Sequence, residues 1–365
     1  MHSASNNNFP CKVILGISGG VDSSVAAFLL KEQGYQVSAV FMRNWQPETD
    51  DPYCTLDQDL SDAKKVCQKL AVPFAVVDFS REYWQRVFQH FLDEYNAGRT
   101  PNPDVLCNKE IKFKAFLEYA LQSGADYIAT GHYVRKEFAN GQYLLKKGLD
   151  ASKDQSYFLY TLGQHELKHS LFPVGDLTKQ EVRALAKQIG LENYAKKDST
   201  GICFIGERNF KKFLSEYLLA KPGDIVTPDH QKLGRHDGLM FYTLGQRQGL
   251  NIGGVKNKSE APWYVVQKNI IHNQLVIAQE GDHPLLMTSK LTCHDVHWVA
   301  DEVPGDCFTS SAKIRYRQSD QQCSVWKITD NAWCVEFFQP QRAITPGQSV
   351  VFYLGDICAG GGVIG

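Results

Sequence analysis

The sequence Gly16-Ile17-Ser18-Gly19-Gly20-Val21-Asp22-Ser23-Ser24 joins a short apolar run, Lys12 to Ile17, to a stretch with helical spacing, Val21 to Gln33. The apolar run is typical of a buried parallel strand. Two adjacent glycines between a strand and a helix let backbone N–H groups close around an anion, and the helix N-terminus adds partial positive charge. The stretch therefore predicts a phosphate-binding loop. It is not a Walker loop, because no Gly-Lys-Ser/Thr follows. The alternative is a tight turn with a serine cap.

Strands and helices alternate around this loop in the first 130 residues. The further expected strands are Gln36 to Met42, Pro73 to Asp78 and Ala125 to Thr130, and the expected helices are Asp57 to Leu70, Glu82 to Tyr95 and Glu110 to Gln122. This alternation predicts an α/β fold with a doubly wound, mostly parallel sheet. Ligands of such sheets bind beyond the carboxyl ends of the strands. Gly16 to Asp22, Met42 and Gly131-His132 all fall at those ends.

The pattern changes after Tyr133. Asn140-Gly141 centres an expected hairpin from Glu137 to Leu145, and Lys179 to Gln188 and Asn209 to Leu219 have helical spacing. From about residue 285 the chain predicts short strands and a small β-barrel: Cys293 to Val299, Thr309 to Gln318, Cys323 to Ile328, Cys334 to Phe338 and Ser349 to Leu354. We expect three domains: residues 1–206, a small mixed central domain at 207–280 and the barrel domain at 281–365.

Composition excludes several classes of protein. The 365 residues are 43% hydrophobic and 22% charged, which is typical of a globular chain. No apolar run approaches the ~20 residues of a membrane span, and residues 1–10 do not read as a signal peptide, so we expect a cytoplasmic protein without a membrane partner. Because the net charge is only −1, a nucleic acid would have to be bound by local basic patches. Ten cysteines without a Cys-X-X-Cys pair predict neither a disulfide framework nor a metal site.

Four further motifs follow the loop in order. They are Thr100-Pro-Asn-Pro-Asp-Val-Leu-Cys-Asn-Lys, Ala129-Thr-Gly-His-Tyr, Ser152-Lys-Asp-Gln-Ser-Tyr-Phe-Leu and Asp198-Ser-Thr-Gly-Ile-Cys-Phe-Ile. Lys313-Ile-Arg-Tyr-Arg and Gly360-Gly-Gly-Val-Ile lie near the end. The loop resembles the pyrophosphate loop of the N-type ATP pyrophosphatases. With the other motifs, the chain from about residue 12 onward resembles the bacterial tRNA-specific 2-thiouridylases.

This resemblance implies an ATP-dependent tRNA-uridine 2-sulfurtransferase. ATP, with Mg²⁺ expected beside it, would adenylate the 2-position oxygen of the wobble uridine and release pyrophosphate. Cys203 would carry sulfur as a persulfide, and Cys107 would resolve it into a Cys107–Cys203 disulfide as sulfur reaches the base. Asp104 would act as a general acid or base. The implied ATP contacts are Gly16, Ile17, Ser18, Gly19, Gly20, Val21, Asp22, Ser23, Met42 and Gly131, and the target base would be held by Asn102, Pro103 and Asp104.

The surroundings of these residues in the sequence carry expectations of their own. Cys107 follows two prolines and precedes a helix expected to begin near Glu110, so the N-terminus of that helix would lower the pKa of its thiol. Cys203 lies in a Gly-flanked loop. Asp104 has the alternative of a carboxylate that caps the helix.

The resemblance also implies partners. The implied tRNA contacts are His132, Lys153, Asp154, Gln155, Arg315, Tyr316 and Gln348. The substrate would be the wobble uridine of Lys, Glu and Gln tRNAs, and the sulfur would come from a persulfide-donating relay protein or a cysteine desulfurase. An anticodon base must leave its stack to react, so a base pocket is expected. His132 has the alternative of a satisfied histidine at a strand end, and Lys153 and Arg315 have that of solvated charges.

Two other functions remain open from the sequence. An ATP-dependent ligase of the amidotransferase-type synthetases would explain the nucleotide loop but would leave Cys107 and Cys203 without a role. A non-catalytic tRNA-binding protein would explain the barrel but not an intact pyrophosphate loop. The reaction product distinguishes the three: AMP with thiolated tRNA, AMP with an amide, or no turnover.

Overall fold

A parallel sheet forms the N-terminal α/β part of the chain. The computed structural model describes residues 10–45, 56–198, 210–253, 260–300 and 302–365. Among these residues the sheet has the strand order β3-β2-β1-β4-β7, and every neighbouring pair is parallel. Its strands are β1 (Lys12–Gly16), β2 (Gln36–Arg43), β3 (Phe74–Asp78), β4 (Tyr127–Ala129) and β7 (Ser170–Leu171). The prediction of a doubly wound sheet is confirmed.

Helices cover both faces of this sheet. One face packs against α1 (Val21–Glu32), α2 (Leu56–Leu70) and α8 (Lys179–Gln188). The other face packs against α6 (Phe116–Gln122). The helical segments before α6 belong to the same apolar cluster: α3 (Ser80–Tyr83), the π-helical turn Trp84–Phe88, α4 (Gln89–Asn96), α5 (Pro103–Leu106) and the π-helical segment Cys107–Ala115. Successive residues of β2 point to opposite faces, so that Ala39 packs on the α1 side and Val40 on the α6 side. Burial on both faces explains the continuous apolar runs.

The helix expected from Glu110 begins at Pro103 instead. The Asn102 side chain caps it by accepting a hydrogen bond from the Val105 amide at 3.4 Å, and Pro103 stands at the first helical position. Proline is favoured there because the first N–H groups of a helix have no internal partner. Cys107 therefore lies within the helix, at the start of its π-helical segment, and not ahead of it. The expected placement of this thiol before a helix N-terminus was wrong.

The C-terminal part is a closed antiparallel barrel, as predicted. Its strands are β12 (Met287–Trp298), β13 (Cys307–Lys313), β14 (Gln321–Thr329), β15 (Ala332–Arg342), β16 (Ser349–Leu354) and β17 (Ile357–Ile364). Pairing of β12 with β17 closes it. Strand β17 was not expected, because it is rich in glycine. A Cβ at Gly362 would lie 2.9 Å from the His294 carbonyl oxygen, so the tight closure requires glycine there. Strand β13 ends at Lys313, which leaves Arg315 and Tyr316 in the following turn and not in the expected strand.

The barrel sheet continues into the N-terminal part. The expected hairpin is formed by β5 (Val134–Ala139) and β6 (Gln142–Lys147). Strand β6 pairs with β17 of the barrel, with Lys146 opposite Ile357 and Leu145 opposite Cys358. The short helix α7 (Gln164–Lys168) packs beside β6 and β7. The two parts are therefore joined by backbone hydrogen bonds.

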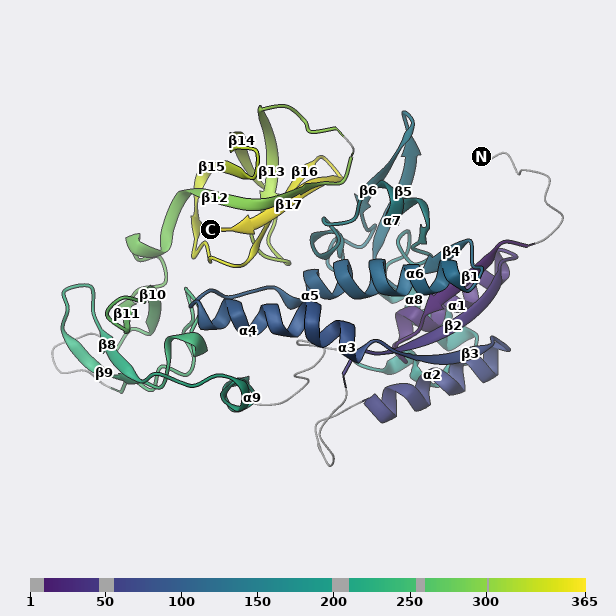
Figure 1. Ribbon diagram of the computed structural model, residues 1–365, viewed down its shortest axis with the longest axis horizontal. Helices are drawn as coiled ribbons and strands as arrows, with labels where there is room; N and C mark the ends of the chain where they lie inside the picture. Colours follow the sequence, from purple (N-terminus) through teal and green to yellow (C-terminus); the bar gives the residue numbers. More distant parts are fainter. Residues whose placement is uncertain (1–9, 46–55, 199–209, 254–259, 301) are drawn as a thin grey trace.

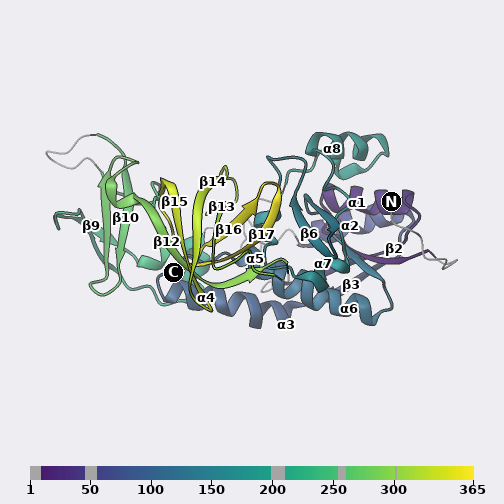
Figure 2. The same ribbon diagram turned by 90° about the horizontal axis from the view of Figure 1, so that it is seen from above.

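A smaller mixed sheet lies between these parts in the sequence and at one end of the molecule in space. It consists of β8 (Gly223–Val226), β9 (Lys232–His236), β10 (Trp263–Asn269) and β11 (Gln274–Gln279), and α9 (Phe210–Tyr217) precedes it. Figures 1 and 2 show this sheet at one end, the barrel in the middle and the parallel sheet at the other end, with the helix from α3 to α4 running below the barrel in Figure 1. The domain boundaries stay a proposal.

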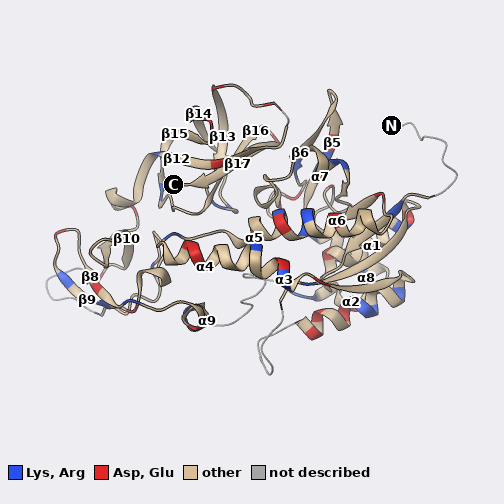
Figure 3. Ribbon diagram, viewed as in Figure 1, with Lys and Arg blue, Asp and Glu red and all other residues tan. Residues whose placement is uncertain are grey.

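Charged residues of both signs are interspersed along the described chain in the view of Figure 3. No helix of the described part is both long and apolar enough to cross a membrane.

Candidate functional site

The loop after β1 holds an open helix N-terminus. Gly20 is the N-cap of α1, and no side chain caps it. The Ser23 and Ser24 hydroxyls instead donate to the Gly20 carbonyl, at 3.2 and 2.8 Å. Gly19 has a φ of +74°, and a Cβ there would collide with the Asp59 backbone. The first amides of α1 thus lack a side-chain acceptor, as an anion site requires.

Two other predicted ATP contacts lie against this loop. The Met42 side chain is packed over Gly16, because a Cβ on Gly16 would lie 2.9 Å from Met42 Cε. Gly131 follows the end of β4 and packs directly against α1. A Cβ at this position would lie 2.7 Å from the Ser23 backbone nitrogen. The ends of β1, β2 and β4 therefore bring these residues together, as parallel topology predicts.

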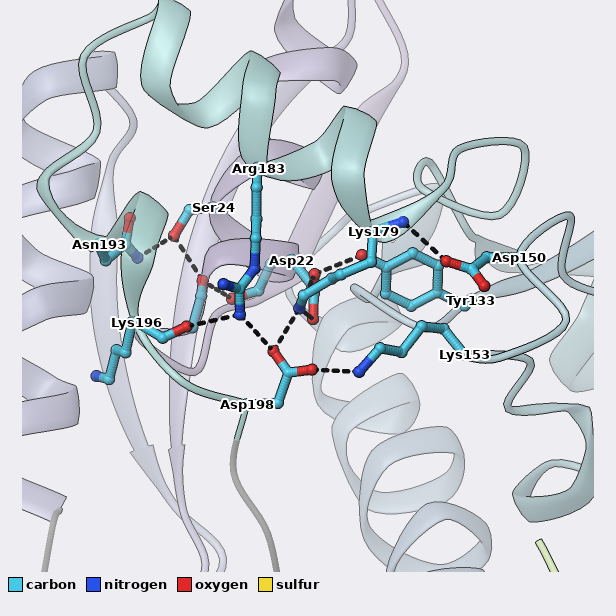
Figure 4. A network of polar contacts seen from close by, with 12 residues as sticks. Asp22, Ser24, Tyr133, Asp150, Lys153, Lys179, Arg183, Asn193, Lys196 and Asp198 are labelled. Atoms are coloured by element: carbon cyan, nitrogen blue, oxygen red, sulfur yellow. Dashed lines mark hydrogen bonds and ion pairs between the residues drawn. The ribbon is translucent and has the colours of Figure 1, made fainter. Parts of the chain in front are cut away.

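Asp22, in the first turn of α1, takes part in an ion-pair network that the sequence analysis missed (Figure 4). Lys179 Nζ, at the start of α8, lies 2.8 Å from both carboxylate oxygens of Asp22. The Tyr133 hydroxyl donates to Asp22 at 2.6 Å. The signal for Lys179 was a capping box in the sequence, in which Thr178 and Glu181 place it at the first position of the helix. The Lys179 side chain is buried, with an exposure of 11%.

Asp198 shares the ammonium group of Lys179. Its Oδ1 atom lies 2.6 Å from Lys179 Nζ, and Lys153 Nζ lies 2.5 Å from its other oxygen (Figure 4). Burial raises the pKa of Asp198, but the hydrogen bonds from Lys153 and Lys179 outweigh burial and hold this pKa at about 2. Arg183 approaches the same carboxylate at 3.4 Å. The chain is thus anchored beside the nucleotide loop at Asp198, the first residue of the motif that contains Cys203. Cys203 itself lies outside the described residues.

Two side chains support the loop from behind. Asn193 Nδ2 donates to the Gly19 carbonyl at 3.0 Å and to Ser24 Oγ at 2.9 Å. Lys196 pairs with Asp59 at 2.7 Å and also reaches the Gly19 carbonyl. Asn193 and Lys196 line a pocket of about 420 Å³ between α2 and the turn Glu192–Ala195. None of the predicted ATP contacts lines this pocket. Asn193 and Lys196 therefore support the loop from the side of α2.

Asp104 and Cys107 lie one turn apart on the helix that begins at Pro103. Residues three apart on a helix face the same side. Cys107 is buried, with 2% exposure, and burial raises the pKa of Asp104, against a smaller lowering by Lys112. The same helix reaches the nucleotide loop, because the Phe116 ring lies beside Gly16. Phe116 comes nine positions after Cys107, so about two helical turns separate the thiol from the loop.

Several predicted tRNA contacts have internal partners. His132 is buried, its Nδ1 lies 2.8 Å from Thr130 Oγ1, and burial lowers its pKa well below 6.5. This is the geometry of the satisfied strand-end histidine. Asp154 is 5% exposed and accepts hydrogen bonds from the Gly148 and Ser156 amides, so it organises a turn. Gln155 accepts from the Tyr133 amide.

Three of the predicted tRNA contacts lie in the barrel, and Lys153 pairs with Asp198. Arg315 is exposed in the turn after β13, where its guanidinium donates to the Ala343 carbonyl at 2.9 Å. Tyr316 packs on Phe158, with ring centroids 4.4 Å apart, and its hydroxyl lies 3.4 Å from the Lys153 carbonyl. Gln348 contacts the backbone that leads into the Cys107 helix. These tRNA roles stay predictions.

Most other described cysteines behave as buried apolar residues. Burial raises the pKa of Cys67 and Cys323 to about 11 and that of Cys293 to about 12. Thiols with such pKa values are poor nucleophiles. No group of three or more histidine, cysteine or acidic residues is placed to bind a metal within the described ranges.

Comparisons with known proteins cover nearly the whole chain. In order, it matches the families described as "tRNA methyl transferase HUP domain" at residues 11–207, "tRNA methyl transferase PRC-barrel domain" at 211–279 and "Aminomethyltransferase beta-barrel domain" at 288–364. A protein of Francisella philomiragia named "tRNA-specific 2-thiouridylase MnmA" is 58% identical over 97% of this chain and 99% of its own. The protein of that name from Francisella tularensis subsp. novicida is 57% identical with the same coverage. A 4-thiouridine synthetase–RNA complex with bound ATP is a distant structural match, with 16% identity, a TM-score of 0.36, and coverage of 56% of this chain and 50% of that one.

Proposed function

The chain belongs to the family of the tRNA-specific 2-thiouridylases, and from this membership we propose that it uses ATP to replace the 2-position oxygen of the tRNA wobble uridine with sulfur. The observation that carries the proposal within the structure is the helix Pro103–Gln122. It holds a thiol and a carboxyl group one turn apart and touches an uncapped phosphate loop farther along. Adenylation needs the loop, and sulfur transfer needs the thiol.

The first step is adenylation of the uridine. The O2 atom attacks the α-phosphorus of ATP, the bond to the β-phosphate oxygen breaks, and pyrophosphate leaves. The free amides of α1 and the Ser18 and Ser23 hydroxyls would stabilise the negative charge of the phosphates. Gly16 and Gly131 let the strand ends pack closely around the loop, and Met42 would offer apolar surface to the nucleoside part. The oxygen of the base then becomes part of a good leaving group, AMP.

The second step transfers sulfur. The terminal sulfur of a Cys203 persulfide attacks C2 of the base, and AMP departs with the former O2. The Cys107 thiolate attacks Cys203 Sγ and breaks the bond between Cys203 Sγ and the transferred sulfur, which stays on the base as the thiocarbonyl. The products are a Cys107–Cys203 disulfide, 2-thiouridine and AMP. An external thiol reductant restores the two thiols before the next turnover.

Asp104 has the properties of a proton carrier in these steps. Burial raises its pKa, so it holds a proton at a higher pH than an exposed aspartate does. Its place one turn from Cys107 would let it exchange a proton with that thiol or with the base held by Asn102 and Pro103.

Magnesium would arrive with the nucleotide. Mg²⁺ keeps several waters and binds through one or two carboxylates together with substrate phosphates. Asp22 is a carboxylate at the loop, which fits this mode of binding, although both of its oxygens contact Lys179 in the structure. The ion would neutralise phosphate charge, while Asp22 and Lys179 place one negative and one positive group at the edge of the phosphate site.

The proposed partners follow from the reaction. The substrates are the Lys, Glu and Gln tRNAs, and the sulfur donor is a persulfide-carrying relay protein or a cysteine desulfurase. The proposed location is the cytoplasm.

The test is a reconstitution with ATP, Mg²⁺, a persulfide source and unmodified tRNA. We expect slower migration of the tRNA in a mercury-containing gel, with one AMP and one pyrophosphate released for each sulfur transferred. AMP with an amide product would identify a ligase, and an absence of turnover would leave a tRNA-binding protein.

A further inference from the structure

The segment Thr100–Asn102 leads into the Cys107 helix and is held by hydrogen bonds to other parts of the chain. Pro101 and Pro103 have no N–H groups, and the segment belongs to no strand or helix. Thr100 and Pro101 are buried, so their carbonyl groups need hydrogen-bond donors from elsewhere in the protein.

A turn of the barrel supplies these donors. Gln348 Nε2 donates to the Thr100 carbonyl at 2.8 Å and to the Pro101 carbonyl at 3.1 Å, so the two hydrogens of one amide group satisfy both. In return, the Thr100 amide donates to the Pro346 carbonyl at 3.0 Å. Gly347 packs flat on Thr100, because a Cβ there would lie 2.9 Å from the Thr100 carbonyl oxygen.

This turn is itself held in place. The Gly347 amide donates to the Ile364 carbonyl, and the Ile364 amide donates to the Gln348 carbonyl, both at 2.8 Å. The next residue, Ser349, accepts a hydrogen bond from the Tyr157 hydroxyl at 2.9 Å. With the pairing of β17 and β6, these contacts make the turn a rigid reference point for the N-terminal part.

We propose that the barrel turn Pro346–Gln348 positions the start of the Cys107 helix, and that Gln348 is a positioning residue for Asp104 and Cys107. The effect of Gln348 on catalysis rests on the proposed function, whereas its effect on the position of the helix does not. Gln348 then acts on the reaction through the protein backbone, from the two carbonyls to the Asn102 cap and on to the first turns of the helix. A direct contact of Gln348 with tRNA is the competing role.

The chain offers a matched control in Gln164. Its Nε2 also donates to two backbone carbonyls, those of Tyr143 at 2.9 Å and Val299 at 2.8 Å, and it also joins the N-terminal part to the barrel part. It does not touch the Thr100–Asn102 segment. Gln164→Ala therefore removes the same kind of interaction at another place.

The first measurement uses the free protein. Gln348→Ala and Gln164→Ala are treated with iodoacetamide, and the alkylation rate of Cys107 is followed by peptide mapping. We expect severalfold faster alkylation of Cys107 in Gln348→Ala, because loosening residues 100–102 lets the buried thiol open to solvent, and an unchanged rate in Gln164→Ala. Gln348→Glu keeps the shape but removes both donors, so it should accelerate alkylation at least as much.

The second measurement separates positioning from tRNA contact. At saturating tRNA, Gln348→Ala should lower the single-turnover thiolation rate about tenfold, while the Kd for tRNA stays within about twofold of wild type. A weakened Kd with unchanged alkylation and unchanged rate at saturation would show a direct tRNA contact and overturn the proposal, as would no change in any readout. If the wild type thiolates no tRNA, the proposed function fails, and the alkylation result still decides the role of Gln348.

Discussion

Lys179 Nζ lies 2.8 Å from each carboxylate oxygen of Asp22, although 157 residues separate the two in sequence. The Asp22 carboxylate lies in the first turn of α1, next to the phosphate loop, and the Lys179 ammonium group balances its negative charge. Since Lys179 also contacts Asp198, the loop, α8 and the chain leading to Cys203 meet at one ammonium group.

Asp22→Ala should suppress adenylation, because it removes the carboxylate next to the phosphates and releases Lys179 from its place. Its affinity for tRNA should change little. The measurement is AMP and pyrophosphate release with unmodified tRNA. Release at the wild-type rate would remove Asp22 from the mechanism.

Lys179→Ala should destabilise the protein by about 1–3 kcal/mol, because it leaves Asp22 and Asp198 facing each other without their shared cation. Lys65→Ala, which breaks an exposed pair with Glu192, should cost under about 0.5 kcal/mol. Urea unfolding at pH 7 measures both. Equal stability of the two variants would contradict this interpretation.

The stability from Asp198 should depend on pH in a defined direction. Its pKa is about 2 in the folded protein and lies below the ordinary value of 3.8, so its contribution is present well above pH 3.8 and is lost as pH falls through that value toward 2. In Asp198→Asn this acid-side loss should shrink. Chemical unfolding from pH 2 to 7 compares the two proteins, and parallel curves would show that Asp198 does not contribute.

Asp104→Asn should keep the fold and lose thiolation. Because burial raises the pKa of Asp104, its ionised form is disfavoured in the folded state, and the stabilising effect of its neutral form is lost as pH rises through that raised pKa. A neutral amide should therefore be tolerated at pH 7, with an unchanged or higher Tm. Thiolation at the wild-type rate would show that Asp104 moves no proton.

Arg315→Ala should weaken tRNA binding and reduce the salt dependence of log Kd by about one phosphate contact. Adenosine nucleotide binding should be unaffected, because Arg315 is exposed in a barrel turn and its guanidinium contacts Ala343 within the barrel. Filter binding at several salt concentrations measures the slope. A slope identical to wild type would mean that Arg315 contacts no phosphate.

Variants of the two cysteines that we propose as catalytic should fail in different ways. Cys203→Ser should accept no labelled sulfur from a persulfide donor, whereas Cys107→Ser should accept it but not deliver it to tRNA. After one turnover without reductant, peptide mapping of the wild type should find a Cys107–Cys203 disulfide, which requires Cα atoms less than roughly 7 Å apart at that stage. If thiolated tRNA forms while both cysteines remain free thiols, the proposed persulfide mechanism is wrong.

Local patterns in the sequence were sufficient for much of the fold. The apolar spacing of Lys179 to Gln188 predicted α8 at its observed bounds, and the glycine loop after Lys12–Gly16 was placed between the right strand and helix. These predictions succeed because strand and helix periodicity and the preferences of glycine depend on neighbours a few residues apart. The start of the Cys107 helix was also encoded locally, because Asn102 is a capping residue and Pro103 follows it. The sequence analysis overlooked this signal.

The sequence by itself thus determined the α/β class, the barrel, the phosphate loop and, through resemblance, the family. Only the tertiary structure decided which polar groups meet: Lys179 with Asp22, and Gln348 with the carbonyls of Thr100 and Pro101, 248 and 247 residues away. It also decided that His132 and Asp154 are buried. Such contacts depend on how whole elements pack and on where buried polar groups find partners, and no spacing along the chain encodes either.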